Sequence, residues 1–354
     1  MQIGATLLAA VEKAAIPSPD CRYPPDGSRE VGDSVSGDMG RRIRFVPPGS
    51  LVEVTCRTVQ GRCLLRPTPL ISDLIRGALA RAARLYPVEI HAFCFLSNHF
   101  HLLLTVSGAD RLASFMNHLN SNLAREVGRH VRWREKFWGR RYQAILVSDE
   151  EPAQVARLLY LLRHGCKENL VRCPGDWPGA NSTEALLTGR PVRGTWFDRT
   201  REYRMTRRKR PPGGEGLVAE ETLELVQLPC WRTLPAELHR VRCAELVALV
   251  EAETAQRIQQ SGREPLGATR ILRQDPHFQP PRLKKGPAPL VHAATSAMRR
   301  EMRLRYRLFA EAFRRASARF RLGLADAAEA LRLFLPGSFP PPGRHIAVVS
   351  SRGG

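Results

Sequence analysis

Two apolar segments of this chain, residues 88–96 and 99–106, are separated by only Ser97 and Asn98. Each segment has the length of a β-strand, and a short polar pair between two such segments is typical of a tight turn. A two-residue turn joins strands that run antiparallel. The pair therefore predicts a β-hairpin, and the rest of the domain has to be arranged around it.

The segments around this hairpin predict further strands and helices. Residues 50–59 alternate apolar and polar positions as a half-buried strand does, and residues 142–147 form another short strand pattern. Apolar residues at helical spacing predict helices over residues 71–86, 109–128 and 152–164. This order of elements is that of a ferredoxin-like βαββαβ sheet with an additional helix. The predicted fold class is α+β, followed by a mostly helical C-terminal region.

Composition divides the chain into four predicted parts. Residues 1–40 mix Pro, Ser, Gly and Asp without a sustained period, which favours a loosely ordered tail. Residues 41–190 hold the predicted sheet domain. Residues 191–216 form a basic linker that ends in Pro-Pro-Gly-Gly-Glu-Gly, and residues 217–354 form a basic, mostly helical C-terminal region.

The charge of the chain indicates a polyanionic partner. The 55 Lys and Arg residues outnumber the 34 Asp and Glu residues, for a formal net charge of +21, and nucleic acid is the first candidate partner. Residues 282–321 hold twelve Lys and Arg residues against Glu301 and Glu311. We expect a helix in this range to contact DNA phosphates, whereas the alternative is an ordinary solvated helix. The expected contact residues are Arg299, Arg300, Arg303 and Arg307.

A second candidate surface for nucleic acid is the loop that precedes the strand of residues 142–147. This loop interleaves cations with flat aromatic rings, and such a surface can stack unpaired bases and hold their phosphates. The alternative is an ordinary loop whose tryptophans, Trp138 in particular, are anchors of the core. The candidate residues are Trp133, Lys136, Trp138, Arg140 and Arg141.

The sequence His99-Phe100-His101 provides a candidate metal site. In a strand, side chains two residues apart project from one face, so His99 and His101 point the same way and Phe100 points to the other face. Two imidazoles on a rigid strand can hold a divalent metal, and the open coordination positions can take phosphate oxygens. The alternative is a histidine pair that only makes hydrogen bonds on a solvated sheet face.

Residues 90–103 read Ile-His-Ala-Phe-Cys-Phe-Leu-Ser-Asn-His-Phe-His-Leu-Leu, and this run resembles the signature of a known family. The family is that of the HUH-type single-tyrosine transposases, in the branch of REP-associated tyrosine transposases. Two further runs resemble it in the expected order, Phe-Trp-Gly-Arg-Arg-Tyr at 137–142 and Asp-Trp-Pro-Gly-Ala-Asn-Ser at 176–182. The resemblance covers about residues 41–190, which is less than half of the chain.

The resemblance implies a nuclease that cuts and rejoins single-stranded DNA, often beside a hairpin. It implies that His99 and His101 hold Mg²⁺ or Mn²⁺, and that a tyrosine on a later helix attacks the phosphate to leave a 5′-phosphotyrosine. The common family form has this tyrosine near the start of the helix, where this chain has Pro152-Ala153. The tyrosine that remains on the predicted helix is Tyr160.

Tyr160 and His164 are four residues apart and therefore share one helical face. In the wider family a polar residue at this spacing often completes the metal shell, so the resemblance implies Tyr160 as nucleophile and His164 as third metal ligand. The alternative is that Tyr160 is a core aromatic and that His164 interacts with the C-terminal end of the helix. Tyr142 is a weaker candidate nucleophile, because an aromatic residue is expected there as part of the sheet.

The predicted function is that of a transposase-like enzyme that binds DNA and performs metal-dependent cleavage and rejoining of a single strand. Two alternatives stay open: a catalytically inactive DNA-binding or regulatory relative of the transposases, and an RNA-binding protein that uses the same sheet and charge. No apolar stretch long enough for a membrane span and no signal peptide are recognised, so we expect no membrane partner and a cytoplasmic location. The resemblance is compatible with a monomer and with a homodimer.

Overall fold

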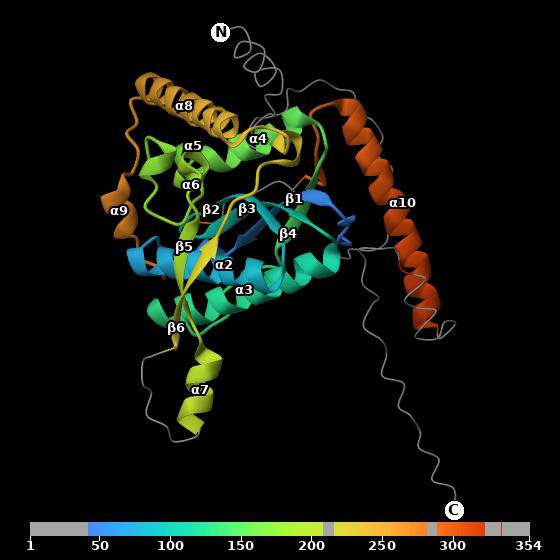
Figure 1. The fold of residues 1–354 in the computed structure, drawn as a ribbon, viewed down its shortest axis with the longest axis horizontal. Helices are drawn as coiled ribbons and strands as arrows, with labels where there is room; N and C mark the ends of the chain where they lie inside the picture. The colour runs from blue at the N-terminus through green and yellow to red at the C-terminus, as the bar shows by residue number, and fades with distance from the viewer. Residues whose placement is uncertain (1–41, 208–215, 282–288, 323–333, 335–354) are drawn as a thin grey trace, which may run out of the picture.

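A five-stranded sheet with the order β2-β3-β1-β4-β7 forms the centre of the molecule (Figure 1). The structure is a computed structural model that describes residues 42–207, 216–281, 289–322 and Phe334, so the predicted tail of residues 1–40 lies outside the described residues. The strands of the sheet are β1 (Ser50–Arg57), β2 (Glu89–Phe95), β3 (His99–Val106), β4 (Gln143–Val147) and β7 (Val291–His292). Strands β1 to β4 pair antiparallel, and β7 adds to β4 in parallel.

The first four strands and the two helices between them confirm the predicted ferredoxin-like unit. Helix α2 (Pro69–Leu85) follows β1, and helix α3 (Ala109–His130) follows β3. Helix α2 begins after Thr68, whose side chain accepts a hydrogen bond of 3.2 Å from the backbone N–H of Ile71. It ends before Pro87, which cannot continue a helix.

Helices α2 and α3 cover one face of the sheet with an apolar core. The strand side chains that point into this core include Val52, Val54 and Phe100, and each is 0% exposed. They pack with Leu79 of α2 and Phe115 of α3. Burial of one such side chain stabilises a fold by about 1.5–3 kcal/mol. This face therefore contributes much of the stability of the domain.

The opposite face of the sheet carries the predicted additional helix and two further helices. These helices are α4 (Glu151–Leu162), α5 (His164–Lys167) and α8 (Ala236–Ser261). Helix α8 packs over α4 on the side away from the sheet (Figure 1). Leu51 and Leu103 of the strands join a second apolar core with Leu158 of α4. The sheet therefore lies between two helical layers.

The predicted linker of residues 191–216 forms regular structure in its described part. The elements here are β5 (Val192–Phe197) and α7 (Arg199–Arg207), and β6 (Val218–Leu223) follows directly after the linker. Strands β5 and β6 form an antiparallel pair that packs on α2, and α7 extends from it (Figure 1). The contact is close at Gly77, where an added Cβ would lie 2.0 Å from the carbonyl oxygen of Thr195. Packing against α2 explains why this segment forms a strand rather than a loose connection.

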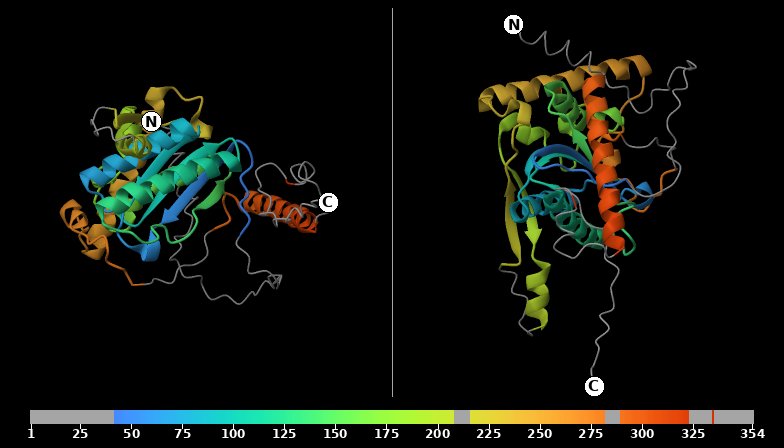
Figure 2. Two further views of the ribbon diagram at one scale, coloured as in Figure 1. Left: turned by 90° about the horizontal axis from the view of Figure 1, so that it is seen from below. Right: turned by 90° about the vertical axis from the view of Figure 1, so that its right-hand side faces the viewer.

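The C-terminal region is mostly helical, as predicted, but it also supplies strands β6 and β7. Its other helices are η3 (Pro229–Trp231), α9 (Ala268–Leu272) and α10 (Ser296–Arg321). Short helices elsewhere in the chain are η1 (Val59–Gly61), η2 (Pro174–Asp176) and α6 (Thr183–Thr188). Helix α10 runs along one side of the sheet (Figure 2). Val291 and Met302 belong to the first core, and Cys243 belongs to the second. The region thus packs into the same body as the sheet.

Among the helices of the described ranges, none has both the length and the apolar character that a bilayer crossing requires.

Candidate metal centre

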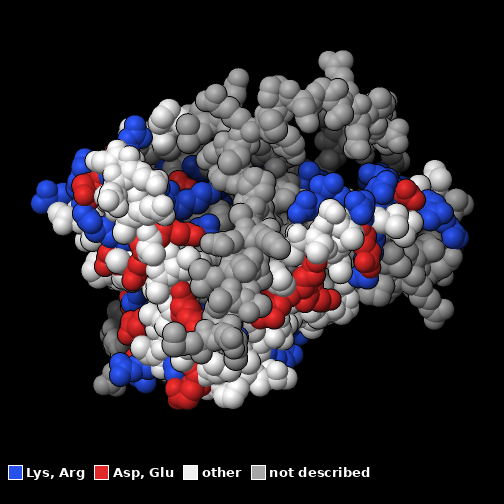
Figure 3. Space-filling view, turned by 90° about the horizontal axis from the view of Figure 1, so that it is seen from above, with Lys and Arg blue, Asp and Glu red and all other residues white. Residues whose placement is uncertain are grey.

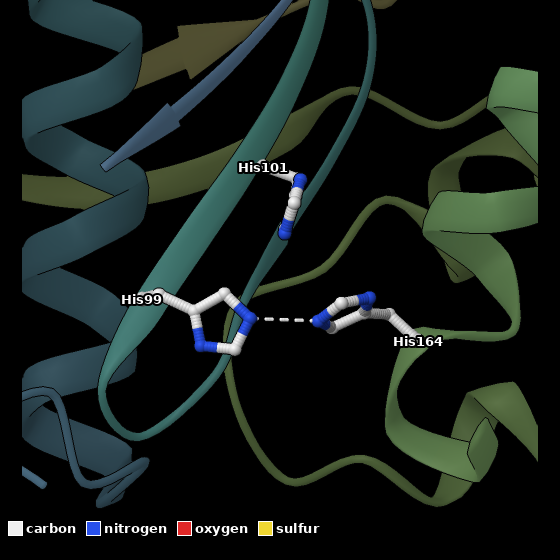
Figure 4. A group of neighbouring side chains, drawn as sticks. All are labelled: His99, His101 and His164. Atoms are coloured by element: carbon white, nitrogen blue, oxygen red, sulfur yellow. Dashed lines mark hydrogen bonds between the residues drawn. The ribbon is translucent and has the colours of Figure 1, made fainter. Parts of the chain in front are cut away.

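Three histidines meet on the face of the sheet that is covered by α4 and α5 (Figure 4). His99 and His101 project from β3 to this face, as their spacing predicted, while Phe100 between them is 0% exposed in the core on the other face. His164 begins α5, directly after α4 ends. The candidate ligand atoms of the three side chains all lie within 4.8 Å of one another.

The rings of these histidines face one another closely. The Nε2 atoms of His99 and His164 are 2.7 Å apart, and the ring centroids of His101 and His164 are 4.6 Å apart. His101 and His164 are buried, and His99 is partly exposed. Sequence spacing placed His164 at the end of one continuous helix, whereas the chain turns at Arg163 and starts a new helix at His164. Despite this turn, the imidazole of His164 lies next to His99 and His101.

The donor set fits a divalent ion. Metal–imidazole bonds of about 2.0–2.1 Å place neighbouring ligand nitrogens about 3 Å apart, and the three histidines need only small adjustments to reach that spacing. Imidazole nitrogen suits transition metals, whereas Mg²⁺ prefers oxygen ligands. Of the two ions expected from the sequence, Mn²⁺ therefore fits these residues better than Mg²⁺.

Each strand histidine has a partner that orients its ring. The Nδ1 atom of His99 lies 2.6 Å from Oδ1 of Asn98, and the Nδ1 atom of His101 lies 2.8 Å from Oε1 of Glu53. When Nδ1 donates its proton to such a partner, Nε2 keeps the lone pair that a metal needs. Both contacts therefore direct Nε2 toward the shared centre.

Glu53 is a functional candidate that the sequence reasoning missed. It lies on β1, is 3% exposed, and also contacts Arg157 at 3.4 Å and His292 at 2.8 Å. Burial alone would raise the pKa of its carboxyl group, but the contacts with His101 and His292 hold this pKa well below its usual range. Glu53 is therefore a buried carboxylate. An acidic residue in the middle of an apolar strand was the signal that could have found it.

Tyr160 lies against the histidine centre. Its ring centroid is 5.3 Å from that of His101 and 5.1 Å from that of His164. The guanidinium of Arg157 lies 4.9 Å from the ring centroid, and the Nζ atom of Lys167 lies 5.5 Å from it. Burial raises the pKa of the Tyr160 hydroxyl, and the charge of Glu53 raises it further. The helix thus places the Tyr160 ring beside the histidine centre.

Tyr142 lies away from these histidines. It packs with the core on the α2 and α3 face, and the guanidinium of Arg44 lies 4.0 Å from its ring centroid. Burial raises the pKa of its hydroxyl. This placement agrees with the expectation that Tyr142 is an aromatic residue of the sheet.

The aromatic residues of the predicted nucleic-acid loop differ in their surroundings. Trp138 is half-buried, packs on Phe100 and Phe137, and donates a 2.9 Å hydrogen bond to the carbonyl oxygen of Asn120. These contacts account for Trp138 as a packing anchor. Trp133 instead lines a hollow of about 600 Å³. The other residues that line this hollow are Ala124, Arg125, Gly128, Arg129, Arg132, Arg134, Glu135 and Phe137.

The predicted cationic residues lie mainly at the surface. Lys136, Arg140 and Arg141 of the loop are exposed. On α10, Arg300, Arg303 and Arg307 are exposed, whereas Arg299 is half-buried and donates a 3.2 Å hydrogen bond to the carbonyl oxygen of Ala293. Figure 3 shows Lys and Arg side chains gathered on the side of the molecule where α10 lies. These side chains are available to a polyanion.

Part of the chain is similar to known transposases. Residues 66–158 match the family model described as "Transposase IS200 like". A protein of Haemophilus influenzae classed as a REP-associated tyrosine transposase is 27% identical over 113 residues, which cover 29% of this chain and 64% of that protein. Residues 66–158 of this chain are thus similar to the IS200-like transposases, and the resemblance stated from its motifs is confirmed.

Two solved structures are similar to part of the chain. One is a REP-associated tyrosine transposase bound to a REP hairpin, with 19% identity and a TM-score of 0.36 over 42% of this chain and 85% of that one. The other is a Deinococcus radiodurans protein classed as a transposase, with 19% identity and a TM-score of 0.25 over 35% of this chain and 95% of that one.

The matched range of the family model contains only part of the candidate site. It includes His99 and His101 and ends at Leu158, before Tyr160 and His164. The assignment of roles to the last two residues therefore depends on their geometry around the histidine centre.

Proposed function

We propose that this protein binds DNA and cuts and rejoins a single strand through a covalent bond to Tyr160. The observation that carries the proposal is the position of the Tyr160 ring, which contacts the rings of His101 and His164 at the three-histidine centre. The similarity of residues 66–158 to the transposase family model supports DNA as the partner. The net charge of +21 supports a polyanionic partner in general.

His99, His101 and His164 would hold the divalent ion through their imidazole nitrogens. The bound ion would act as a Lewis acid on the oxygens of the scissile phosphate. The hydroxyl oxygen of Tyr160 forms a bond to phosphorus, and the bond between phosphorus and the 3′ oxygen breaks. The phenol loses its proton, and the departing 3′ oxygen gains one. The products are a 5′-phosphotyrosine and a free 3′ hydroxyl.

The surroundings of Tyr160 support this step. Burial raises the pKa of its hydroxyl, so positive charge near the ring is needed to favour the phenolate during attack. Arg157 and Lys167 both lie over the ring and supply positive charge. The reverse reaction, attack of a 3′ hydroxyl on the phosphotyrosine, rejoins the strand without ATP because the phosphodiester energy is conserved.

We assign the exposed arginines of α10 and the cations of the 133–141 loop to DNA phosphates. Arg300, Arg303 and Arg307 follow one another at helical spacing on α10 and are exposed. Trp133 borders a hollow lined by four arginines, a setting that suits an unpaired base with its phosphate. These contacts would hold the strand, whereas the histidine centre would act on it.

The test is an adduct assay with the full chain. Labelled single-stranded DNA that carries a hairpin is incubated with Mn²⁺ and the wild-type protein, and covalent protein–DNA complexes are separated on a denaturing gel. We expect an adduct with the wild-type protein and with a Tyr142→Phe variant, and none with Tyr160→Phe. If the wild-type protein binds the hairpin but forms no adduct, the chain is a non-catalytic DNA-binding relative. Tighter binding to the same hairpin made of RNA would favour an RNA partner.

A further inference from the structure

A short C-terminal strand reaches the metal centre from the edge of the sheet. Strand β7 pairs with β4 through Leu146 with Val291 and Val147 with His292. The backbone N–H of Ser148 donates a 2.9 Å hydrogen bond to the carbonyl oxygen of His292, which extends the pairing by one residue. This pairing places the His292 side chain on the α4 face, where it is 8% exposed.

His292 contacts the same carboxylate that orients the metal ligand His101. Its Nε2 atom lies 2.8 Å from Oε2 of Glu53, while Oε1 of Glu53 lies 2.8 Å from Nδ1 of His101. Each carboxylate oxygen thus has an imidazole partner from a different strand. Arg157 lies 3.4 Å from Oε2 and compensates the buried negative charge.

A second carboxylate fixes the segment that follows β7. Oε2 of Glu150 accepts a 2.8 Å hydrogen bond from the backbone N–H of Ala294. Oε1 of Glu150 accepts hydrogen bonds from the backbone N–H and the hydroxyl of Thr295, at 3.2 and 2.7 Å. Glu150 directly precedes α4, and Thr295 caps the start of α10. The start of the basic helix is therefore tied to the start of the helix that carries Tyr160.

We propose that His292 is a positioning residue for His101, acting through Glu53, and that residues 291–295 couple the basic helix α10 to the metal centre. The proposal deepens the proposed function, because it rests on His101 as a metal ligand. Contacts that hold a ligand from behind fix its ring orientation and its tautomer, and their loss typically weakens metal binding about 10–100-fold. The C-terminal region would thus complete the active site in addition to contacting DNA.

The geometry explains why the carboxylate needs its second imidazole. With His292 in place, both oxygens of the Glu53 carboxylate have an imidazole contact, which restricts its rotation away from Nδ1 of His101. Without His292, Oε2 of Glu53 would keep only its contact with Arg157. At 3.4 Å, this contact is longer than the contacts with His101 and His292. The His101 ring would then lose its fixed tautomer, and its Nε2 lone pair would point to the centre for only part of the time.

Calorimetric titration of the full chain with Mn²⁺ tests the proposal. We expect His292→Ala to weaken Mn²⁺ binding by about tenfold or more, and His292→Gln, whose amide can still donate to Glu53, to recover part of that loss. Glu150→Ala, which frees residues 294 and 295, should weaken binding by a smaller factor. The matched control is His91→Ala, since His91 is 1% exposed and bonded to Val226 and Thr105 instead.

The control separates lost stability from lost positioning. His91→Ala should lower stability but leave Mn²⁺ affinity unchanged, and equal Mn²⁺ affinity in wild type, His292→Ala and His292→Gln would overturn the proposal. If His292→Ala does not fold, ¹⁵N NMR of the imidazoles in His292→Gln decides. We expect Nδ1 of His101 to be protonated in the wild-type protein, with a small share of the other tautomer in His292→Gln and a larger share in Glu53→Gln.

The two arms also separate this inference from the proposed function. If the wild-type protein binds no Mn²⁺, the proposed metal-dependent reaction is contradicted, while the NMR arm still measures whether His292 and Glu53 fix the His101 tautomer. A His101 tautomer that is the same in the wild-type protein and all of these variants would overturn the positioning role.

Discussion

The two faces of the central sheet are built from the same strands but have different chemistry. On the α2 and α3 face, side chains such as Phe100 and Leu102 are apolar and 0% exposed. On the α4 face, the neighbouring positions of β1 and β3 carry Glu53, His99 and His101. Because side chains alternate along a strand, one face can supply stability while the other holds polar groups in fixed positions. A rigid apolar layer thus supports a buried polar site.

Buried polar groups on the α4 face destabilise the fold unless they have hydrogen-bond or ion-pair partners. An unpaired buried carboxylate would be strongly destabilising, but Glu53 has partners on β3, β7 and α4. The comparison predicts that substitutions on the apolar face change stability, whereas substitutions on the polar face change metal binding and catalysis.

Phe100→Ala should have the largest effect on stability. The ring of Phe100 stacks on Phe95 at a centroid distance of 4.7 Å and also contacts Trp138. Removing it should lower the free energy of unfolding by about 3–5 kcal/mol, measured by denaturant titration. Mn²⁺ affinity, measured well below the melting temperature, should change by less than about threefold. If the Phe100→Ala variant folds but does not bind Mn²⁺, the separation between a stabilising face and a metal-binding face is contradicted.

The His99→Ala, His101→Ala double variant should mainly lose Mn²⁺ affinity, in contrast to Phe100→Ala, which should mainly lose stability. Removing two of three imidazole ligands should weaken Mn²⁺ binding by at least about 100-fold, equivalent to about 2.7 kcal/mol. The ion should also restore less thermal stability to this variant than to the wild-type protein, because a ligand stabilises only the state that binds it. Equal Mn²⁺ binding by the two proteins would contradict the metal centre.

Neutralising α10 should have a moderate effect on DNA binding and none on metal binding. Arg300, Arg303 and Arg307 changed together to Gln should reduce the slope of log affinity against log salt by about 2–3, since each phosphate contact contributes about 0.9. The control changes the exposed arginines Arg190, Arg263 and Arg270 to Gln, which alters the net charge equally. Equal slopes for the two triple variants would mean that the overall charge, rather than α10, contacts the DNA.

The smallest expected effect concerns pH. Burial lowers the pKa of His91, while its contacts with the carbonyl oxygen of Val226 and with Glu89 act in the opposite direction. Below pH 6.5 the unfolded chain therefore binds a proton that the folded chain does not, and stability falls as the pH falls. The contribution of one such group is at most about 1.4 kcal/mol per pH unit.

The free energy of unfolding, measured with chelator present between pH 7.5 and 5.5, should therefore depend less steeply on pH in His91→Gln than in the wild-type protein. Parallel curves for the two proteins would show that His91 does not titrate on unfolding.

Local patterns in the sequence predicted the elements that carry the site. Alternation along a strand placed His99 and His101 on one face, and helical spacing placed Tyr160 and His164 near each other. These relations span only a few residues, so they follow from strand and helix geometry alone. The roles of Tyr160 and His164 stay predictions.

The sequence could not reveal which distant residues complete the site. Glu53 meets His101 because β1 pairs with β3 in one register, with Thr55 opposite His101. His292 reaches Glu53 from a strand of only two residues, which is too short for any periodic pattern. Strand β5 within the predicted linker was not predicted for a similar reason, because it is stabilised by packing on α2.

The measurement that tests the central claim most directly is the identification of the residue joined to DNA. After reaction with single-stranded hairpin DNA and Mn²⁺, the adduct is digested with nuclease and trypsin and analysed by mass spectrometry. Cleavage after Arg157 and Arg163 isolates Tyr160 in residues 158–163, while Tyr142 falls in residues 142–157. We expect a nucleotide joined through its phosphate to the tyrosine of the peptide Leu-Leu-Tyr-Leu-Leu-Arg. A modified tyrosine in any other peptide, or no modified peptide at all, would contradict it.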